Sequence, residues 1–382
     1  MMASAVFHRV LTYIEKPTPQ YSGRGETALA IAVLPLAFAY KMLDCLYGKE
    51  PIPGQPWLYM LLLSAFTALA FSSVLFLATP VGERWVRRML AENRTTWLAS
   101  IPSLFVGLFL LLLWGLGLPE LQTQSFSMIT APWSQLPLPL FLLLAGGVLT
   151  SCFRGGLTMS LKRSSSAPDA PSFGWRQLVC VLLATLPFLF VQEQLPLLWC
   201  FTTPVAVTVL VYGSGLGREY FGYSFVPRSA KEALFVLSLL ASGLLIFLLA
   251  NFLVGDITYT GGLWHTSWQR LYDSIFVYLL IVGISEEVLF RCGLLTLVAA
   301  LFAKKSALGW CLQKPRLSAV LFISLLFGLV HLPRGLLFSF LALLASLLYG
   351  LAFVAGKTLF GPVLLHGLLN VLILMNFHLA DF

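Results

Sequence analysis

The chain has 382 residues, of which 58% are hydrophobic and only 10% are charged, and its formal net charge is +8 at pH 7. One soluble core could not bury so much apolar surface, so the composition excludes an ordinary globular domain and predicts a polytopic membrane protein. The basic excess does not indicate nucleic-acid binding, because Lys and Arg beside membrane spans are expected next to an anionic inner leaflet.

Apolar runs of about 20 residues, the length that crosses a bilayer as a helix, recur along the whole chain. They predict an all-α transmembrane bundle of about 10–11 spans with a helical catalytic core at its C-terminal end. In chain order, the expected helices are 27–46, 57–79, 98–118, 134–152, 177–191, 195–212, 232–254, 271–302, 317–333, 335–355 and 360–378.

The distribution of basic residues supports this count and predicts an orientation. With the N-terminus inside, 19 of the 24 Lys and Arg residues fall in inner segments, as expected for short cytoplasmic loops. The alternation holds only if 177–212 crosses the membrane twice. We therefore expect an integral, multi-pass protein with a cytoplasmic N-terminus and an outer C-terminus, in the plasma (inner) membrane if the source is bacterial.

Ionisable residues inside apolar segments divide the chain into two parts. They gather after residue 230, whereas 213–230 mixes Gly, aromatic and charged residues in the manner of a loop or a segment lying on the membrane surface. We expect an accessory transmembrane region over 1–215 and a functional core over 230–382.

Two adjacent acids, Glu286 and Glu287, stand with Arg291 inside an apolar run. Ionisable side chains at membrane depth are costly and usually face a protein interior or a water-filled cavity. On a helix, Glu287 and Arg291 are four residues apart and share a face, whereas Glu286 points about 100° away. We expect Glu287 to pair with Arg291 and Glu286 to face a cavity; the alternative is one structural ion cluster.

Two histidines accompany these acids in later spans. His331 follows Phe327 by four residues, and His366 precedes Asn370 by four, so each pair shares a helix face. A lone buried histidine is more often a packing residue, but three polar motifs within 85 residues favour a site. The expected boundaries place His331 and His366 about 12 Å apart in depth, so one site requires tilted or offset helices.

The runs EEVLFR (Glu286 to Arg291), FGLVH (Phe327 to His331) and HGLLN (His366 to Asn370) resemble three family signatures. These are the EExxxR, FxxxH and HxxxN motifs of the CAAX-protease and bacteriocin-processing (Abi) intramembrane endopeptidases, which include the type II CAAX prenyl endopeptidases. The resemblance covers about the last 150 residues. Family members commonly have Gly directly after the Arg, whereas this chain has Cys292 before Gly293.

The resemblance implies an intramembrane endopeptidase in which Glu286 activates a water and His331 helps to position it. His366 and Asn370 would stabilise the oxyanion, while Glu287, Arg291 and Phe327 would support the site. The mechanism requires no cofactor. The implied partners are the lipid bilayer and a membrane-associated peptide or protein, including a prenylated or otherwise lipid-modified one.

Two other classes of function stay open from the residues alone. His331, His366 and one glutamate would suit a catalytic zinc ion, although the chain has no HExxH motif. Intramembrane Glu, Arg and His also mark ion pathways in transporters, and a protease fold can act as a scaffold or immunity protein. Loss of substrate cleavage in Glu286→Gln would separate a peptidase from a scaffold.

Overall fold

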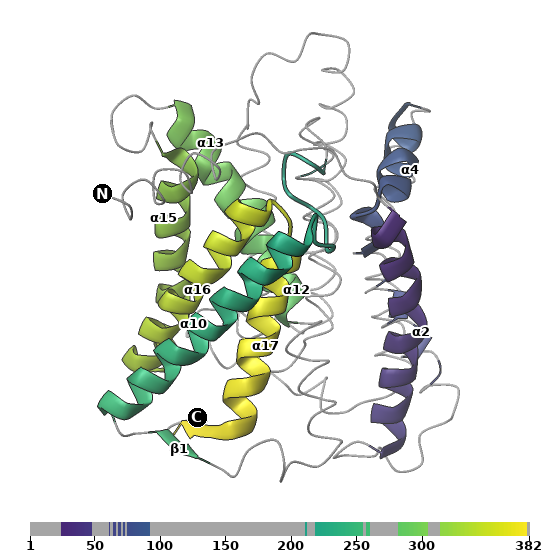
Figure 1. Cartoon of the computed structure of the whole chain (residues 1–382). Helices are drawn as coiled ribbons and strands as arrows, with labels where there is room; N and C mark the ends of the chain where they lie inside the picture. The colour runs from purple at the N-terminus through teal and green to yellow at the C-terminus, as the bar shows by residue number, and fades with distance from the viewer. Residues whose placement is uncertain are drawn as a thin grey trace, which may run out of the picture. The chain divides into compact units, whose positions relative to one another are not determined.

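A computed structural model gives the fold of the chain (Figure 1). It describes residues 24–47, 61, 64, 65, 68, 69, 72, 75–91, 211, 218–254, 257–259, 282–304 and 314–379. The helices are α2 (Arg24–Tyr47), α4 (Pro80–Ala91), α10 (Ala230–Val254), α12 (Ile284–Glu287), the π-helix η4 (Val288–Leu295), α13 (Thr296–Lys304), α15 (Pro315–Val330), the 3-10 turn η5 (Leu332–Arg334), α16 (Leu336–Gly356) and α17 (Phe360–Asn376).

The chain divides into two compact units. One contains Met1–Ala78 and Glu219–Phe382, and the other contains Thr79–Arg218. The predicted division into an accessory region (1–215) and a core (230–382) stays a prediction. All the described candidate site residues belong to the first unit.

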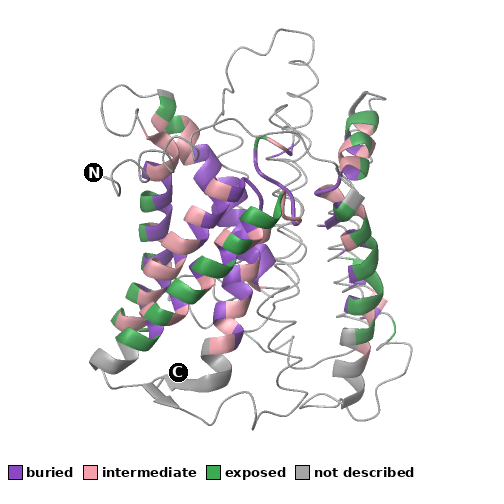
Figure 2. Cartoon of the chain, viewed as in Figure 1, coloured by how far each residue is buried: buried purple, intermediate pink, exposed green. Residues whose placement is uncertain are grey.

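Helix α16 is the centre of the C-terminal bundle, because it packs against α15, α17 and α10 (Figure 1). A core of six buried residues joins α10, α16 and α17, and the outward face of α10 is exposed (Figure 2). The core residues are Val236, Leu239, Tyr349, Ala352, Leu365 and Leu369. Tyr349 also borders the candidate site described below, so hydrophobic packing helps to fix the site.

Small residues allow α15 and α16 to approach closely. A Cβ at Gly350 would lie 2.7 Å from Val320, and one at Gly328 would lie 2.8 Å from the Cβ of Leu343. The Ser339 hydroxyl donates to the Gly328 carbonyl across the same interface at 2.6 Å. Close approach through small residues and hydrogen-bonding serines is typical of helix pairs in membranes.

A loop ahead of α10 is fastened to the turn between α16 and α17. The backbone N–H of Leu359 donates to the Ser224 carbonyl at 2.7 Å, and Arg228 Nη2 donates to the Lys357 carbonyl at 2.6 Å. Buried Glu232 accepts from the Thr358 hydroxyl and, at 2.6 Å, from the backbone N–H of Arg228. We call Arg228, Glu232 and Thr358 the clasp; it holds the start of α17 against α10.

The described helices agree with the expected spans at α2, α10 and α16, and the helical architecture is confirmed. The expected span 317–333 is too long, since α15 ends at Val330 and His331 caps it. Pro333 explains the early end, because the residue before a proline avoids helical geometry. The expected spans 98–118, 134–152 and 177–191 lie outside the described residues.

Three elements, two strands and one helix, were not expected. The strands β1 (Ile257–Tyr259) and β2 (Phe377–Leu379) pair antiparallel, with Thr258 opposite His378. Helix α4 lies in a segment predicted as an inner loop, because a search for apolar runs misses short charged helices. Its start was nevertheless readable: the Thr79 hydroxyl accepts from the Gly82 N–H at 3.0 Å and Pro80 takes the first helical position.

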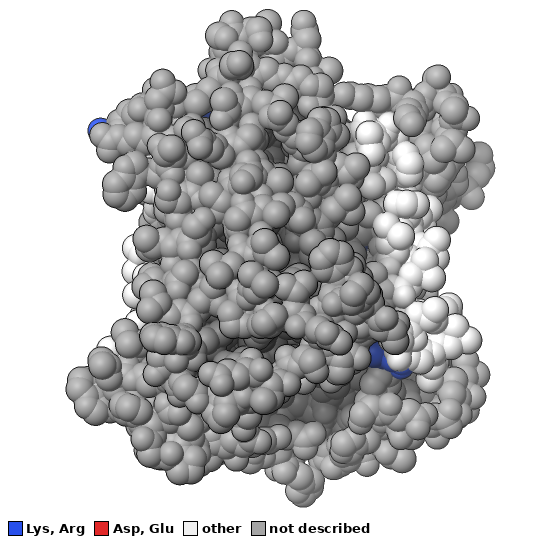
Figure 3. Space-filling view, turned by 180° about the vertical axis from the view of Figure 1, so that it is seen from behind, with Lys and Arg blue, Asp and Glu red and all other residues white. Residues whose placement is uncertain are grey.

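Two described helices are long and apolar enough to cross a membrane, Ala230–Leu249 and Leu336–Gly356. Shorter apolar helices lie at Gly25–Ala39, Pro315–Val330 and Phe360–Leu372. Seen from behind, the described residues show uncharged surface with a few Lys or Arg atoms and no Asp or Glu (Figure 3).

Candidate active site

The EExxxR motif lies where the backbone changes from α12 to the π-helix η4. Glu287 ends α12 and Arg291 lies in η4, and both side chains are fully buried. Arg291 Nε donates to Glu287 Oε2 at 2.7 Å, so the predicted pairing is confirmed. Short π-helical segments inside helices occur frequently at functional sites.

Arg291 is held on several sides by side chains from other helices. Its Nη2 donates to Ser346 Oγ on α16 at 2.8 Å. Its guanidinium lies 5.6 Å from the ring centroid of Phe327 and 5.8 Å from that of Tyr349, which is within cation–π range. The Glu287–Arg291 pair therefore fixes η4 against α15 and α16.

His366 lies between the two adjacent glutamates. Its Nδ1 is 2.9 Å from Glu287 Oε1, and its Nε2 is 3.8 Å from Glu286 Oε2. Because the ion-paired carboxylate of Glu287 can only accept, Nδ1 carries the hydrogen of that bond. The Tyr349 ring stacks on the imidazole with centroids 4.9 Å apart and planes 14° apart. Position, plane and tautomer of His366 are thus all determined.

Glu286 differs from Glu287 although both are buried. Among the described residues, Glu286 Oε2 has no hydrogen-bond partner. The nearest polar atom given for it is Nε2 of His366, at a separation that is too long for a direct hydrogen bond. Buried unsatisfied polar atoms are few in folded proteins and each needs an explanation. A water or a substrate group between the two side chains would supply one.

His331 and Phe327 approach the cluster from α15. His331 has φ of −89° and ψ of 0°, a sparsely populated conformation in which many active-site residues are found. Its Nδ1 donates to the Phe327 carbonyl at 2.8 Å, which leaves Nε2 available. The Phe327 ring lies 4.5 Å from the His331 ring and 6.0 Å from the His366 ring, measured between centroids. The helices are therefore offset enough to bring both histidines to one ring.

Among the described residues, Asn370 is the one predicted site residue whose side chain makes no hydrogen bond, ion pair or ring contact with the cluster. It lies one turn beyond His366 on α17 and is partly buried. Within the described part of the chain its side chain makes no hydrogen bond. The structure therefore joins Glu286, Glu287, Arg291, Phe327, His331 and His366, and places Asn370 beside them.

Sequence reasoning missed two residues of the cluster, Ser346 and Tyr349. Both lie on α16, which is otherwise largely apolar. Their two hydroxyl groups, three residues apart and so on one face of the helix, were the sequence signal that could have identified them.

Cys292, the departure from the family pattern, is buried in η4. Phe338 lies 5.6 Å from the His331 ring, and the Arg334 guanidinium lies 5.6 Å from the Phe338 ring.

A catalytic zinc ion would need several His, Cys, Asp or Glu side chains around one point. Across the described ranges, no three His, Cys, Asp or Glu side chains are placed to hold one metal ion together. His366 donates its Nδ1 hydrogen to Glu287, which is the kind of bond that a metal-bound imidazole makes through its other ring nitrogen.

Residues 266–372 match the family model of the type II CAAX prenyl endopeptidase Rce1-like proteins. This range contains all three motifs. The match confirms the predicted resemblance. Comparison with curated proteins found no match, and comparison with solved structures found none either. Together with the apolar helices, the family match indicates a membrane protein of the protease class.

Proposed function

We propose that the chain is a multi-pass intramembrane endopeptidase that hydrolyses a peptide bond of a membrane-associated substrate with a water activated by Glu286. One observation carries the proposal: of two adjacent buried glutamates, Glu287 is bonded to Arg291 and His366, whereas Glu286 Oε2 has no described hydrogen-bond partner. The family match supports the protease class.

In the proposed reaction, the free carboxylate of Glu286 accepts a proton from a water whose oxygen attacks the peptide carbonyl. The tetrahedral intermediate then collapses, the C–N bond breaks, and the proton passes to the leaving amine. A carboxylate with no competing donor is available for this exchange, which is why we assign the base to Glu286 and not to Glu287.

The oxyanion would be stabilised from α17. In its protonated form His366 has an Nε2 hydrogen on the side of Glu286, because Nδ1 is already bonded to Glu287. Asn370 offers an amide donor one turn further along the same helix. A preorganised donor of this kind is typically worth about 10²–10³ in rate. We propose that His331 positions the water through its Nε2.

The proposal also covers the topology of the chain and its substrate. The proposed architecture has about 10–11 spans with a cytoplasmic N-terminus and an outer C-terminus. Because residues 266–372 match a prenyl endopeptidase family, a prenylated C-terminal peptide is the first substrate to test. The proposed chemistry requires no metal ion, and zinc catalysis remains the alternative.

The deciding experiment compares Glu286→Gln with wild type in detergent or nanodiscs, using a fluorogenic prenylated peptide. The variant keeps the shape of the side chain but cannot accept the proton. We expect kcat/KM to fall by about 10²–10⁴, with an unchanged melting temperature. Cleavage at the wild-type rate by folded Glu286→Gln would end the proposal.

A further inference from the structure

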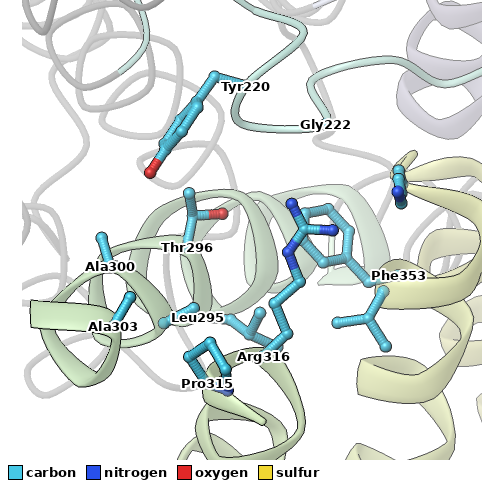
Figure 4. Close-up of a pocket in the computed structure, with 12 residues that line it drawn as sticks. Tyr220, Gly222, Leu295, Thr296, Ala300, Ala303, Pro315, Arg316 and Phe353 are labelled. Carbon is cyan, nitrogen blue, oxygen red and sulfur yellow. The ribbon is translucent and has the colours of Figure 1, made fainter. Parts of the chain in front are cut away.

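A pocket of about 270 Å³ lies where η4 meets α13, α15 begins and α16 ends (Figure 4). The wall around Gly222 is tightly packed. Gly222 has φ of +62°, and a Cβ there would lie 3.0 Å from both the Lys357 carbonyl oxygen and the Phe353 ring. The described lining residues are Tyr220, Gly222, Leu295, Thr296, Ala299, Ala300, Ala303, Pro315, Arg316, Phe353, Val354 and Lys357.

Polar groups converge on this space from separate elements. The Tyr220 hydroxyl points into the pocket from the loop ahead of α10, the Thr296 side chain from α13, and the Arg316 guanidinium from the start of α15 (Figure 4). Burial raises the pKa of Tyr220, and Arg316 acts in the opposite direction. At neutral pH Tyr220 therefore carries its proton and can donate a hydrogen bond.

Lys357 adds a second cation in an unfavourable backbone conformation. It follows the last residue of α16 with φ of 56° and ψ of 34°, a left-handed geometry. Glycine or asparagine is usual at this position, since other residues pay a steric cost there. Its backbone is held in place by the bond from its N–H to the Phe353 carbonyl and by the bond from Arg228 to its own carbonyl.

The remaining lining is apolar, and none of the described lining residues is acidic. Two cations and the Tyr220 hydroxyl opposite an alanine-rich wall suit a ligand with an anionic head and an apolar attachment. The Thr296 hydroxyl does not take part as a donor, because it gives its hydrogen to the Arg291 carbonyl at 3.3 Å. The volume lies just below the range of about 300–1,000 Å³ for drug-sized ligands, so it fits a head group and not a large cofactor. Arginine forks are also well matched to phosphate oxygens.

We propose that this pocket binds the phosphate group of a partly apolar ligand and that an anionic membrane phospholipid supplies it. The sequence places the pocket at the basic edge of the bundle, with Lys304, Lys305 and Lys314 nearby in the chain. Basic pockets at the cytoplasmic end of transmembrane helices are established binding sites for anionic head groups in general. The site does not depend on the proposed peptidase activity.

The test is lipid binding by the full-length chain, measured by native mass spectrometry from detergent. The probes are phosphatidylglycerol, zwitterionic phosphatidylcholine and inorganic phosphate. Arg316→Gln removes one cation, and Lys357→Gly removes the other while it relieves the left-handed backbone. Lys314→Gln is the matched control, because it changes the net charge equally at a residue that does not line the pocket.

We expect phosphatidylglycerol to bind at least about tenfold more tightly than phosphatidylcholine. Each pocket variant should lose about tenfold in affinity for phosphatidylglycerol, and the control should change by less than about twofold. Retained melting temperature, above all in Lys357→Gly, shows that loss of binding is not loss of folding.

Equal binding of the two lipids, or wild-type binding by both pocket variants, would overturn the proposal. If inorganic phosphate displaces the lipid at the concentration at which phosphatidylglycerol itself binds, the lipid assignment is wrong and the ligand is a soluble phosphate.

Discussion

Two buried acidic sites in the C-terminal bundle invite comparison. In the clasp, both oxygens of Glu232 accept hydrogen bonds, one from Thr358 and one from the Arg228 backbone. In the EExxxR motif, both oxygens of Glu287 are bonded as well. Glu286, the next residue in the chain, has an oxygen with no described partner.

The difference separates structural acids from a reactive one. A buried carboxylate whose two oxygens both accept hydrogen bonds stabilises the fold, because its removal would leave buried donors without an acceptor. A buried carboxylate with an open oxygen costs stability and is retained only where something else requires it. By this criterion the described residues of the bundle include two structural glutamates and one candidate base.

The strongest test of the comparison after Glu286→Gln itself is the effect on folding of Glu287→Gln. Removing one partner of a buried ion pair leaves the other charge uncompensated, and we expect a loss of about 3–5 kcal/mol in unfolding free energy. Denaturant-induced unfolding in one detergent would measure it. The exposed Arg87, paired with Glu83 at 2.8 Å in α4, supplies the control: Arg87→Gln should change stability by less than about 1 kcal/mol.

The clasp should respond less strongly and without a catalytic effect. Thr358→Val keeps the side-chain shape but removes the donor to Glu232, and we expect a cost of about 1–3 kcal/mol in the same unfolding assay. The catalytic rate per folded molecule should stay within about twofold. The neutral control is Ser238→Ala, which removes an exposed hydroxyl that donates to the Phe235 carbonyl. If this variant loses as much unfolding free energy as Thr358→Val, the clasp does not stabilise the fold in the way we infer.

The α15–α16 contact that supports the site can be tested by crowding it. Gly350→Ala puts a Cβ 2.7 Å from Val320, and overpacking of this kind typically costs about 1–3 kcal/mol. Val320→Ala makes room for the new methyl group. The double variant should therefore be less destabilised than the sum of the single changes, whereas additive costs would mean that the two helices are not in tight contact.

The smallest expected effect is that of metal removal. The proposed mechanism uses a carboxylate and a water, so exhaustive chelation should leave kcat/KM within about twofold of its starting value. Loss of activity on chelation, restored by added Zn²⁺, would favour the zinc alternative and would require ligands beyond those that the described residues bring together.

The sequence by itself determined the contacts that lie within one helix. Glu287 and Arg291 are four residues apart, and this spacing alone predicted their ion pair and left Glu286 on another face. The order of the three motifs also predicted the family resemblance that residues 266–372 confirm. Local geometry suffices in these cases because helix periodicity fixes which neighbours share a face.

Only the tertiary structure decided which groups meet from different helices. The expected helix starts placed His331 and His366 at different depths in the membrane. In the structure, the ring of Phe327 nevertheless lies next to both imidazole rings. From α16, Ser346 contacts Arg291 and Tyr349 contacts His366. Neither residue belongs to one of the three sequence motifs. How far one helix is shifted along another depends on their packing, such as the close approach at Gly328 and Gly350. The spacing of residues along the sequence does not determine this shift.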